Sequence, residues 1–270
     1  MPELPEVETA RQGLEPHLLD RRIRQVILRR PDLRWPIPGE IRVRLTGQKI
    51  LQVRRRAKYL LIDTANGSAI VHLGMSGSVR MVPAKTRPGT HDHFDFVLES
   101  DLALRFNDPR RFGCLLWQAD GETHELLRDL GPEPLSEQFD GDYLFRLSRG
   151  RRAPVKTFLM DQRIVVGVGN IYAAESLFQA GIAPGRAAGR ISRERYAALA
   201  NAVKDILGHA IARGGTTLRD FIQPDGMPGY FEQELQVYGH EGEPCRRCGR
   251  PLRHASIGQR ASVWCGHCQR

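Results

Sequence analysis

The stretch CRRCGRPLRHASIGQRASVWCGHC, residues 245–268, determines how the end of this chain folds. Its cysteines follow the spacing C-x2-C-x16-C-x2-C, in which two tight turns each present a pair of thiols, as in tetrahedral zinc sites. A ribbon of about thirty residues builds no core of its own, so bound metal would supply its folding free energy. We predict one structural Zn²⁺ per chain, held by Cys245, Cys248, Cys265 and Cys268. Four buried thiols or two disulfides are the alternative.

Arginine dominates the charge of this ribbon and of the whole chain. Among 270 residues, 40 Lys and Arg oppose 31 Asp and Glu, which gives a formal net charge of +9. Such a balance favours a nucleic acid as partner, because each neutralised phosphate releases counterions. A solvated basic surface in a protein from a GC-rich genome explains the charge equally well, so charge alone does not decide.

The composition is that of a globular protein. Hydrophobic residues make up 41% of the chain and charged residues 26%. No run approaches eighteen apolar residues, and the start Met-Pro-Glu has no signal-peptide pattern. We therefore expect a cytoplasmic protein with reduced thiols and no membrane partner. The fifth cysteine, Cys114, lies in the apolar run 112–117 and is expected to be ordinary core.

Hydrophobic spacing predicts the elements. Residues 3–18 have a helical pattern with acidic residues in the first turn. Short apolar runs between turn residues predict strands at 24–28, 50–63, 69–73, 94–98 and 103–106. Beyond the Gly-Pro-Glu-Pro at 131–134, helices are predicted at 142–148, 156–160, 171–179 and 192–213, and residues 214–230 are loop-like.

These elements predict a multidomain α+β fold. We expect a β-sandwich with an N-terminal helix over residues 1–132, a helical domain over 133–232 and the zinc ribbon over 233–270.

The N-terminus offers a nucleophile. Removal of Met1 before a small residue would leave Pro2 as a secondary amine, part of which is unprotonated near neutral pH. Such an amine attacks the anomeric carbon of a sugar and forms an iminium, while Glu3 and Glu6 stand beside it for proton transfer. Many proteins begin Met-Pro, and Pro-Glu is also an ordinary helix start, so this signal alone is weak.

Three further clusters strengthen the case for a catalytic N-terminus. In RRRAKYL, 54–60, Lys58 is a candidate acid/base among arginines. The turns HLGMSGS, 72–78, and NDPRRFG, 107–113, carry side chains suited to wedging into a base stack. Glycines before a helix in GVGN, 167–170, suit a phosphate. A charged strand edge, core packing and a plain turn are the respective alternatives.

Taken together, the motifs resemble the bacterial formamidopyrimidine-DNA glycosylase family. The similarity runs from residue 2 to the C-terminus through motifs in a fixed order: PELPEVET, RRAKYL, HLGMSG, HDH, DPRRFG, LGPEPL, GVGNIYA-ESLF, GGTTLRDF, PGYF-QELQVYG and the zinc ribbon. The resemblance implies that the helical domain contains a helix-two-turn-helix. It also implies a DNA repair enzyme that removes oxidised purines, 8-oxoguanine and formamidopyrimidines, as a glycosylase and abasic-site lyase.

The resemblance also implies roles for individual residues. Pro2 would form the Schiff base, Glu3 would transfer protons at the sugar, Lys58 would donate a proton in β-elimination and Arg260 would assist δ-elimination. Met75, Arg110 and Phe112 would fill the gap left by the flipped base, which Glu6 helps to hold. Further DNA contacts would come from His91, Arg151, Lys156, Asn170 and Tyr238.

The partner implied is double-stranded DNA with oxidised bases or abasic sites, bound by a monomer at the nucleoid. Zinc would be structural, because four thiolates leave no position open for water. The rivals are an endonuclease VIII-like enzyme for oxidised pyrimidines, a non-catalytic DNA-binding relative and an RNA-binding zinc-ribbon protein. The start Pro-Glu-Leu-Pro-Glu favours oxidised purines over the first rival.

Overall fold

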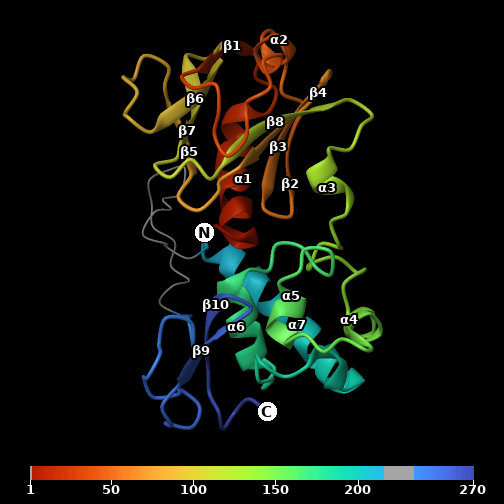
Figure 1. Ribbon diagram of the computed structural model, residues 1–270. Coiled ribbons are helices and arrows are strands. Elements are labelled where there is room, and N and C mark those ends of the chain that lie inside the picture. Colours follow the sequence, from red (N-terminus) through yellow and green to blue (C-terminus); the bar gives the residue numbers. More distant parts are fainter. Residues whose placement is uncertain (1, 216–233) are drawn as a thin grey trace. The chain divides into compact units, whose positions relative to one another are not determined.

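The computed structural model describes residues 2–215 and 234–270, which form two compact units (Figure 1). The first unit contains residues 2–128 and 213–215, and the second contains residues 129–212 and 234–270. Most of the predicted loop 214–230 lies outside the described residues. Among the residues described, no helix is long and apolar enough to cross a membrane.

The first unit contains two antiparallel four-stranded sheets (Figure 1). One has the order β1 (Ile23–Leu28), β6 (Asp92–Leu98), β7 (Leu102–Asn107), β5 (Ser78–Pro83). The other has the order β2 (Gln52–Arg56), β3 (Tyr59–Thr64), β4 (Gly67–His72), β8 (Cys114–Ala119). Strands β2, β3 and β4 pair consecutively as hairpins, so the turn between β2 and β3 is fixed by the ladder on both sides.

A single hydrophobic core joins the two sheets. Phe94, Phe96 and Phe106 come from one sheet, and Leu60 and Ile62 from alternate positions of the other. The rings of Phe94 and Phe106 stack with centroids 4.8 Å apart. Side chains from both inner faces therefore share one core, which confirms the predicted β-sandwich.

The first helix, α1 (Leu4–Leu18), contacts strands of both sheets. Its apolar positions are all buried, as the helical spacing predicts: Leu4, Val7, Ala10, Leu14 and Leu18. Two shorter helices, α2 (Ile41–Leu45) and α3 (Glu125–Arg128), complete the unit. The core thus fixes α1, and with it the position of the N-terminal residues.

In the first unit, strands β5 and β8 and helices α2 and α3 were not predicted as elements. Among the described strands, β5 is an edge strand that pairs only with β7, and it ends at Pro83. Its side chains are mostly half-buried, so its apolar alternation is weak. Strand β8 reads as a continuous apolar run from Cys114 to Trp117, which does not distinguish strand from helix. Cys114 is buried there, as expected of core.

The second unit is mainly helical. Its helices are α4 (Gly141–Ser148), α5 (Val155–Leu159), α6 (Asn170–Gln179), the short 3-10 helix η1 (Ala188–Arg190) and α7 (Arg193–Ala212). All four predicted helices are confirmed within one or two residues. Ser192 Oγ accepts the N–H of Arg195 at 3.4 Å, so Ser192 caps the start of α7.

The ribbon hairpin of β9 (Arg253–Ile257) and β10 (Arg260–Trp264) belongs to this second unit. Its apolar side chains share a small core with α6, made by Ala174, Phe178, Val237, Leu252 and Val263 together with Cys245 and Cys265. Helix α6 therefore supplies the hydrophobic surface that the ribbon is too short to build by itself.

Candidate nucleic-acid interface and metal centre

The N-terminal residues are held by the first turn of α1. Pro2 and Glu3 are buried, and the N–H of Glu3 donates to Glu6 Oε2 at 2.8 Å. Glu6 has no exposed surface. A buried carboxylate at the first turn of a helix is stabilised by the helix N–H groups. The Glu6 carboxylate therefore fixes the backbone that carries Pro2 and Glu3.

The backbone of Gly215 approaches the same carboxylate closely. A Cβ placed on Gly215 would lie 3.0 Å from Glu6 Oε1, and the φ angle of Gly215 is +78°. Both the contact and the left-handed backbone favour glycine here. The glycine pair at 214–215 thus serves the candidate site and is not only a helix stop.

Lys58 lies in the two-residue turn between β2 and β3, next to Ala57 with a φ of +54°. Arg55 Nη1 donates to the carbonyl oxygen of Ala57 at 3.0 Å, and Arg55 Nε pairs with Glu8 Oε2 of α1 at 3.0 Å. Lys58 itself is 4% exposed. The ion pair therefore connects the helix that follows Pro2 to the turn that presents Lys58.

The surroundings of Lys58 disfavour a second positive charge. Burial, with the positive charges of Lys58 and Arg34, lowers the pKa of His72 to about 4. Its Nδ1 accepts the N–H of Gly74 at 3.0 Å, as a neutral imidazole can. Burial raises the pKa of Cys114, whose neighbour across the ladder is His72, to about 12. His72, which lies close enough to Lys58 for the ammonium charge to lower its pKa, thus stays neutral at pH 7.

The expected wedge residues lie on two turns of the first unit. Met75 is half-buried, Arg110 is exposed and Phe112 is 44% exposed. The guanidinium carbon of Arg110 lies 4.9 Å from the centre of the Phe112 ring, within the range of a cation–π contact. His91 is exposed just before β6. Arg110 and Phe112 are thus exposed to solvent, as a DNA wedge requires.

In the second unit, two basic residues border one pocket. Arg151 and Arg260, both exposed, line a pocket of about 320 Å³ together with Thr157 and Asp161. The pocket lies where α5 meets the turn of the ribbon hairpin. The structure thus brings Arg151 and Arg260 together, although they are far apart in sequence.

Two other residues expected to contact DNA, Lys156 and Asn170, hold the ribbon through hydrogen bonds. The ammonium of Lys156 donates to the carbonyl oxygen of Ala261 at 2.9 Å and to Ser262 Oγ at 2.7 Å. Asn170 Nδ2 donates to the same carbonyl at 3.1 Å. Lys156 is 1% exposed. Helices α5 and α6 therefore both hold the strand that begins at Arg260, and direct DNA contact by Lys156 or Asn170 stays a prediction.

The chain segment that carries Tyr238 is fixed by Glu175 of α6. The Glu175 carboxylate accepts the N–H groups of Gln236 at 2.9 Å, Val237 at 3.0 Å and Tyr238 at 2.8 Å. Burial raises the pKa of Glu175, and the three N–H donors lower it in part. This carboxylate supports the half-buried Tyr238, whose DNA contact stays a prediction.

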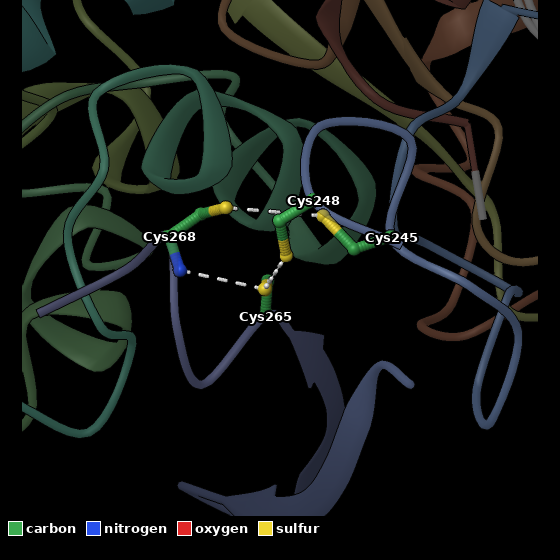
Figure 2. A group of neighbouring side chains, drawn as sticks. All are labelled: Cys245, Cys248, Cys265 and Cys268. Carbon is green, nitrogen blue, oxygen red and sulfur yellow. Dashed lines mark hydrogen bonds between the residues drawn. The ribbon is translucent and has the colours of Figure 1, made fainter. Parts of the chain in front are cut away.

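Figure 2 shows the four cysteine side chains of the ribbon converging from two turns. All four Sγ atoms lie within 4.8 Å of one another, with 3.5 Å between Cys248 and Cys265 and 4.0 Å between Cys245 and Cys268. Tetrahedral zinc with bonds of about 2.3 Å places sulfurs about 3.8 Å apart, so the cluster fits the ion. Zinc here would bind four thiolates and fold the ribbon.

The protonation of Cys265 also suits a metal ligand. Burial raises the pKa of Cys265, but the N–H groups of Cys268 and His267 and the neighbouring thiols lower it to about 7. Burial and the same neighbouring thiols raise the pKa of Cys268 to about 12. The thiolate is the form that binds zinc. Among the residues that the structure describes, this is the one group of three or more metal-binding side chains.

Glu8, Arg55 and Glu175, which hold these sites, were not singled out from sequence. Nor was Asp108, whose carboxylate accepts the hydroxyl of Ser76 and the N–H of Gly113, both at 2.8 Å. Each acts through groups distant in sequence, so spacing gives no direct signal. The available signal was weaker: Glu175 is a charged residue within the otherwise apolar stretch 171–178, and Asp108 precedes a proline in a turn.

Three family models match successive parts of the chain. They describe the formamidopyrimidine-DNA glycosylase N-terminal domain at residues 1–115, the formamidopyrimidine-DNA glycosylase H2TH domain at 130–222, and a zinc finger found in FPG and IleRS at 242–270. The second match confirms the expected helix-two-turn-helix, and the third agrees with the four-cysteine cluster.

Close relatives carry the same name over their full length. The chain is 71% identical over 270 residues to a formamidopyrimidine-DNA glycosylase of Stenotrophomonas maltophilia strain K279a, with 100% of both chains covered. It is also 71% identical over 271 residues to one of Xanthomonas oryzae pv. oryzae strain PXO99A, again with 100% of both covered.

Solved structures similar to this chain carry the same family name. The MutM (FPG) protein of Thermus thermophilus is 41% identical with a TM-score of 0.89, covering 99% of this chain and 98% of that one. The Lactococcus lactis FPG mutant G226P in complex with a Fapy-dG containing DNA is 31% identical, with a TM-score of 0.93 and 100% of both chains covered. A Lactococcus lactis Fpg bound to abasic-site DNA has a TM-score of 0.92 at 31% identity, over 99% of both chains.

Proposed function

The chain belongs to the formamidopyrimidine-DNA glycosylase family, and we propose that it excises oxidised purines from double-stranded DNA with Pro2 as nucleophile. It is a DNA glycosylase of base-excision repair, and the oxidised-pyrimidine and non-catalytic alternatives are not favoured. The observation that carries the proposal is the N-terminus: Glu6 holds the backbone of Glu3, and Glu3 adjoins the residue that can supply a secondary amine at the chain end.

The reaction begins at the sugar of the damaged nucleotide. The Pro2 nitrogen lone pair forms a bond to C1′, the glycosidic bond breaks, and the base leaves with its electron pair. The nitrogen loses its proton and the departing base takes one up, so the number of protons balances. The Glu3 carboxyl group donates a proton to the ring oxygen as the sugar opens, which leaves an iminium between Pro2 and C1′. Splitting one substitution into two covalent steps lowers the barrier of each.

Strand cleavage follows from the iminium. It acidifies the C2′ proton, whose loss breaks the bond from C3′ to the 3′ phosphate oxygen, with Lys58 as proton donor in this β-elimination. Arg260 assists the second, δ-elimination, which breaks the bond from C5′ to the 5′ phosphate oxygen. Water then hydrolyses the Schiff base and releases Pro2 as a free amine.

DNA binding must offset the cost of flipping the lesion, a few kcal/mol of lost stacking and pairing. We propose that Met75, Arg110 and Phe112 fill the vacated position and that Glu6 contacts the flipped base. His91, Arg151, Lys156, Asn170, Tyr238 and Arg260 are proposed to contact the DNA strands. Because the net charge is +9, binding should weaken steeply as salt rises.

The three-part division at 1–132, 133–232 and 233–270 assigns the nucleophile to the first part and structural Zn²⁺ to the last. We infer that the protein acts as a monomer, since one chain supplies every proposed role. We further infer that it works in the bacterial cytoplasm, associated with the nucleoid through its DNA substrate.

Borohydride trapping tests the proposal. Reduction of the iminium during reaction with a duplex containing 8-oxoguanine should give a stable adduct whose mass equals protein plus DNA, joined at Pro2. A variant with two residues added before Pro2 should give no adduct, whereas the same two residues added after Arg270 should leave trapping intact. Equal trapping by both extended variants would overturn the role of Pro2.

A further inference from the structure

The two turns that carry the wedge residues touch one another. Met75 lies in the turn 72–78, and Arg110 and Phe112 lie in the turn 107–113. A Cβ on Gly74 would clash with the backbone N of Gly113, and one on Gly113 would lie 2.5 Å from the carbonyl oxygen of His72. The backbones are therefore in direct contact, without side chains between them.

One buried carboxylate ties these turns together. Asp108 has no exposed surface, and its Oδ1 accepts the hydroxyl of Ser76 at 2.8 Å and the N–H of Arg110 at 3.3 Å. Its Oδ2 accepts the N–H of Gly113 at 2.8 Å. Asp108 thus bonds the middle and the end of its own turn and a residue of the other turn.

Two neighbours complete the arrangement. Ser76 Oγ also accepts the N–H of Arg110 at 3.3 Å, so the serine and the carboxylate share this donor. The ring nitrogen Nε2 of His93, itself buried, donates to the carbonyl oxygen of Asp108 at 2.8 Å. Hydrogen bonds to an ionised carboxylate are stronger than those between neutral groups, and buried ones are costly to leave unmade.

The bonds also hold a backbone that would otherwise relax. Arg111, between Arg110 and Phe112, has a φ of +58°. Residues other than glycine seldom adopt this left-handed backbone conformation. The N–H of Arg110 on one side and that of Gly113 on the other both donate to Asp108. The carboxylate therefore imposes the turn that directs Arg110 and Phe112 outward.

We propose that Asp108 is a positioning residue that joins the two turns into one rigid wedge, so that Met75, Arg110 and Phe112 enter the DNA as a unit. This inference rests on the proposed function, in which those three side chains replace the flipped base. A preorganised wedge loses little conformational freedom on insertion, whereas two independent turns would have to be ordered by the DNA.

Loss of the Asp108 carboxylate should impair opening of the base pair and spare the chemistry at the sugar. Asp108→Ala should slow excision of 8-oxoguanine from a duplex about tenfold in single turnover, since the wedge is needed to open the pair. Borohydride trapping on an abasic site in single-stranded DNA, which needs no opening, should stay within about twofold of wild type. Fluorescence of 2-aminopurine placed beside the lesion should rise more slowly by the same factor as excision.

Two further variants keep the test decisive. Ser76→Ala removes one link between the turns and leaves the Gly113 bond of Asp108, so it should show a smaller loss, about threefold, in the same duplex assays only. Asp120→Asn changes an exposed aspartate of the same unit and should alter neither assay. If Asp108→Ala fails to fold, Ser76→Ala still decides.

The outcomes are distinct. Equal losses in duplex excision and single-strand trapping, or no loss in either, would overturn the positioning role of Asp108. Absence of trapping by the wild-type protein would instead overturn the proposed function, and the wedge with it. Loss confined to the duplex assays, with slowed 2-aminopurine fluorescence, supports the inference.

Discussion

At the scale of single residues, the candidate site depends on a few side chains that hold backbone. Glu6 binds the N–H of Glu3, and Arg55 binds the carbonyl of Ala57 next to Lys58. None of these contacts makes the reaction possible by itself. Each limits the positions that a reacting group can reach, and small displacements of reacting groups are costly to rate.

The ion pair between Glu8 and Arg55 gives the first prediction. Glu8→Gln removes the charge that holds Arg55 Nε and loosens the turn that carries Lys58. We expect strand cleavage to slow by about three- to tenfold while Schiff-base formation is retained. Gel assays that separate cleavage from borohydride trapping measure both. Glu15→Gln, which removes only a partner of Arg11, is the control; an equal effect would refute the positioning role.

A second prediction concerns Gly215, and its control is a glycine whose substitution should change stability in the opposite direction. Gly215→Ala places a Cβ 3.0 Å from Glu6 Oε1 and strains a φ of +78°, so it should destabilise the protein by about 1 kcal/mol or more and slow excision. Gly208→Ala meets no atom within 4 Å inside α7 and should stabilise by about 0.5–1 kcal/mol. Urea unfolding measures both; stability changes of the same sign would contradict the prediction.

His72 gives a third prediction, for pH. Its pKa in the folded protein is about 4, below the ordinary 6.5, so the unfolded chain takes up a proton first as the pH falls. Stability is thus fully present above pH 6.5 and decreases toward pH 4, by on the order of 3 kcal/mol in the limit. His72→Gln should flatten Tm between these pH values, whereas His17→Gln, an exposed control, should not.

At the scale of elements, the sheet β1-β6-β7-β5 contains a buried network of charges. Arg105, 1% exposed, binds both carboxylate oxygens of Asp95, at 2.9 and 2.8 Å, and donates to the carbonyl oxygen of Thr86 at 3.0 Å. Arg29 pairs with the same carboxylate at 3.0 Å. The network therefore ties two adjacent strands to the loop that leads to His91.

This network predicts a second acid transition. Burial alone would raise the pKa of Asp95, but the hydrogen bonds and charges of Arg29 and Arg105 lower it below its ordinary value. Its stabilisation is therefore present above pH 4 and is lost as the pH falls further. Asp95→Asn should destabilise at pH 7 by about 3 kcal/mol or more, since Arg105 loses its partner, but less at pH 3. Circular dichroism at both pH values would check this, and equal destabilisation would contradict it.

The sequence predicted most helices and strands but few of the contacts between residues distant in sequence. Helices α1, α4, α6 and α7 have strong helical spacing or caps, and their bounds agree with the pattern. Strand β5 was missed because an edge strand needs little apolar alternation. The role of Asp108 was missed because its partner Ser76 lies 32 residues away, and no spacing rule connects two turns. Motifs thus located the candidate reacting residues, while the residues that position them required the fold.

At the scale of the whole molecule, bound zinc determines whether the ribbon of the second unit is folded. Removal of zinc by a chelator should unfold the ribbon and release Arg260, because the four thiolates are its main cross-link. We expect loss of DNA affinity by about tenfold or more and loss of strand cleavage, both restored by added Zn²⁺. Mobility shift and zinc analysis measure this; full activity of a zinc-free protein would refute it.

The shared core of α6 and the ribbon limits which zinc fingers this chain can accept. Phe178 packs against Val237, Leu252 and Val263, and Arg247 lies over the Phe178 ring at 4.4 Å while it donates to the Phe178 carbonyl at 3.1 Å. The zinc finger therefore packs specifically against α6 and is not freely exchangeable for another finger. A chimera that imports a foreign finger would keep the four cysteines but lose the side chains that fit Phe178, so it should bind metal yet be less stable than the natural pairing.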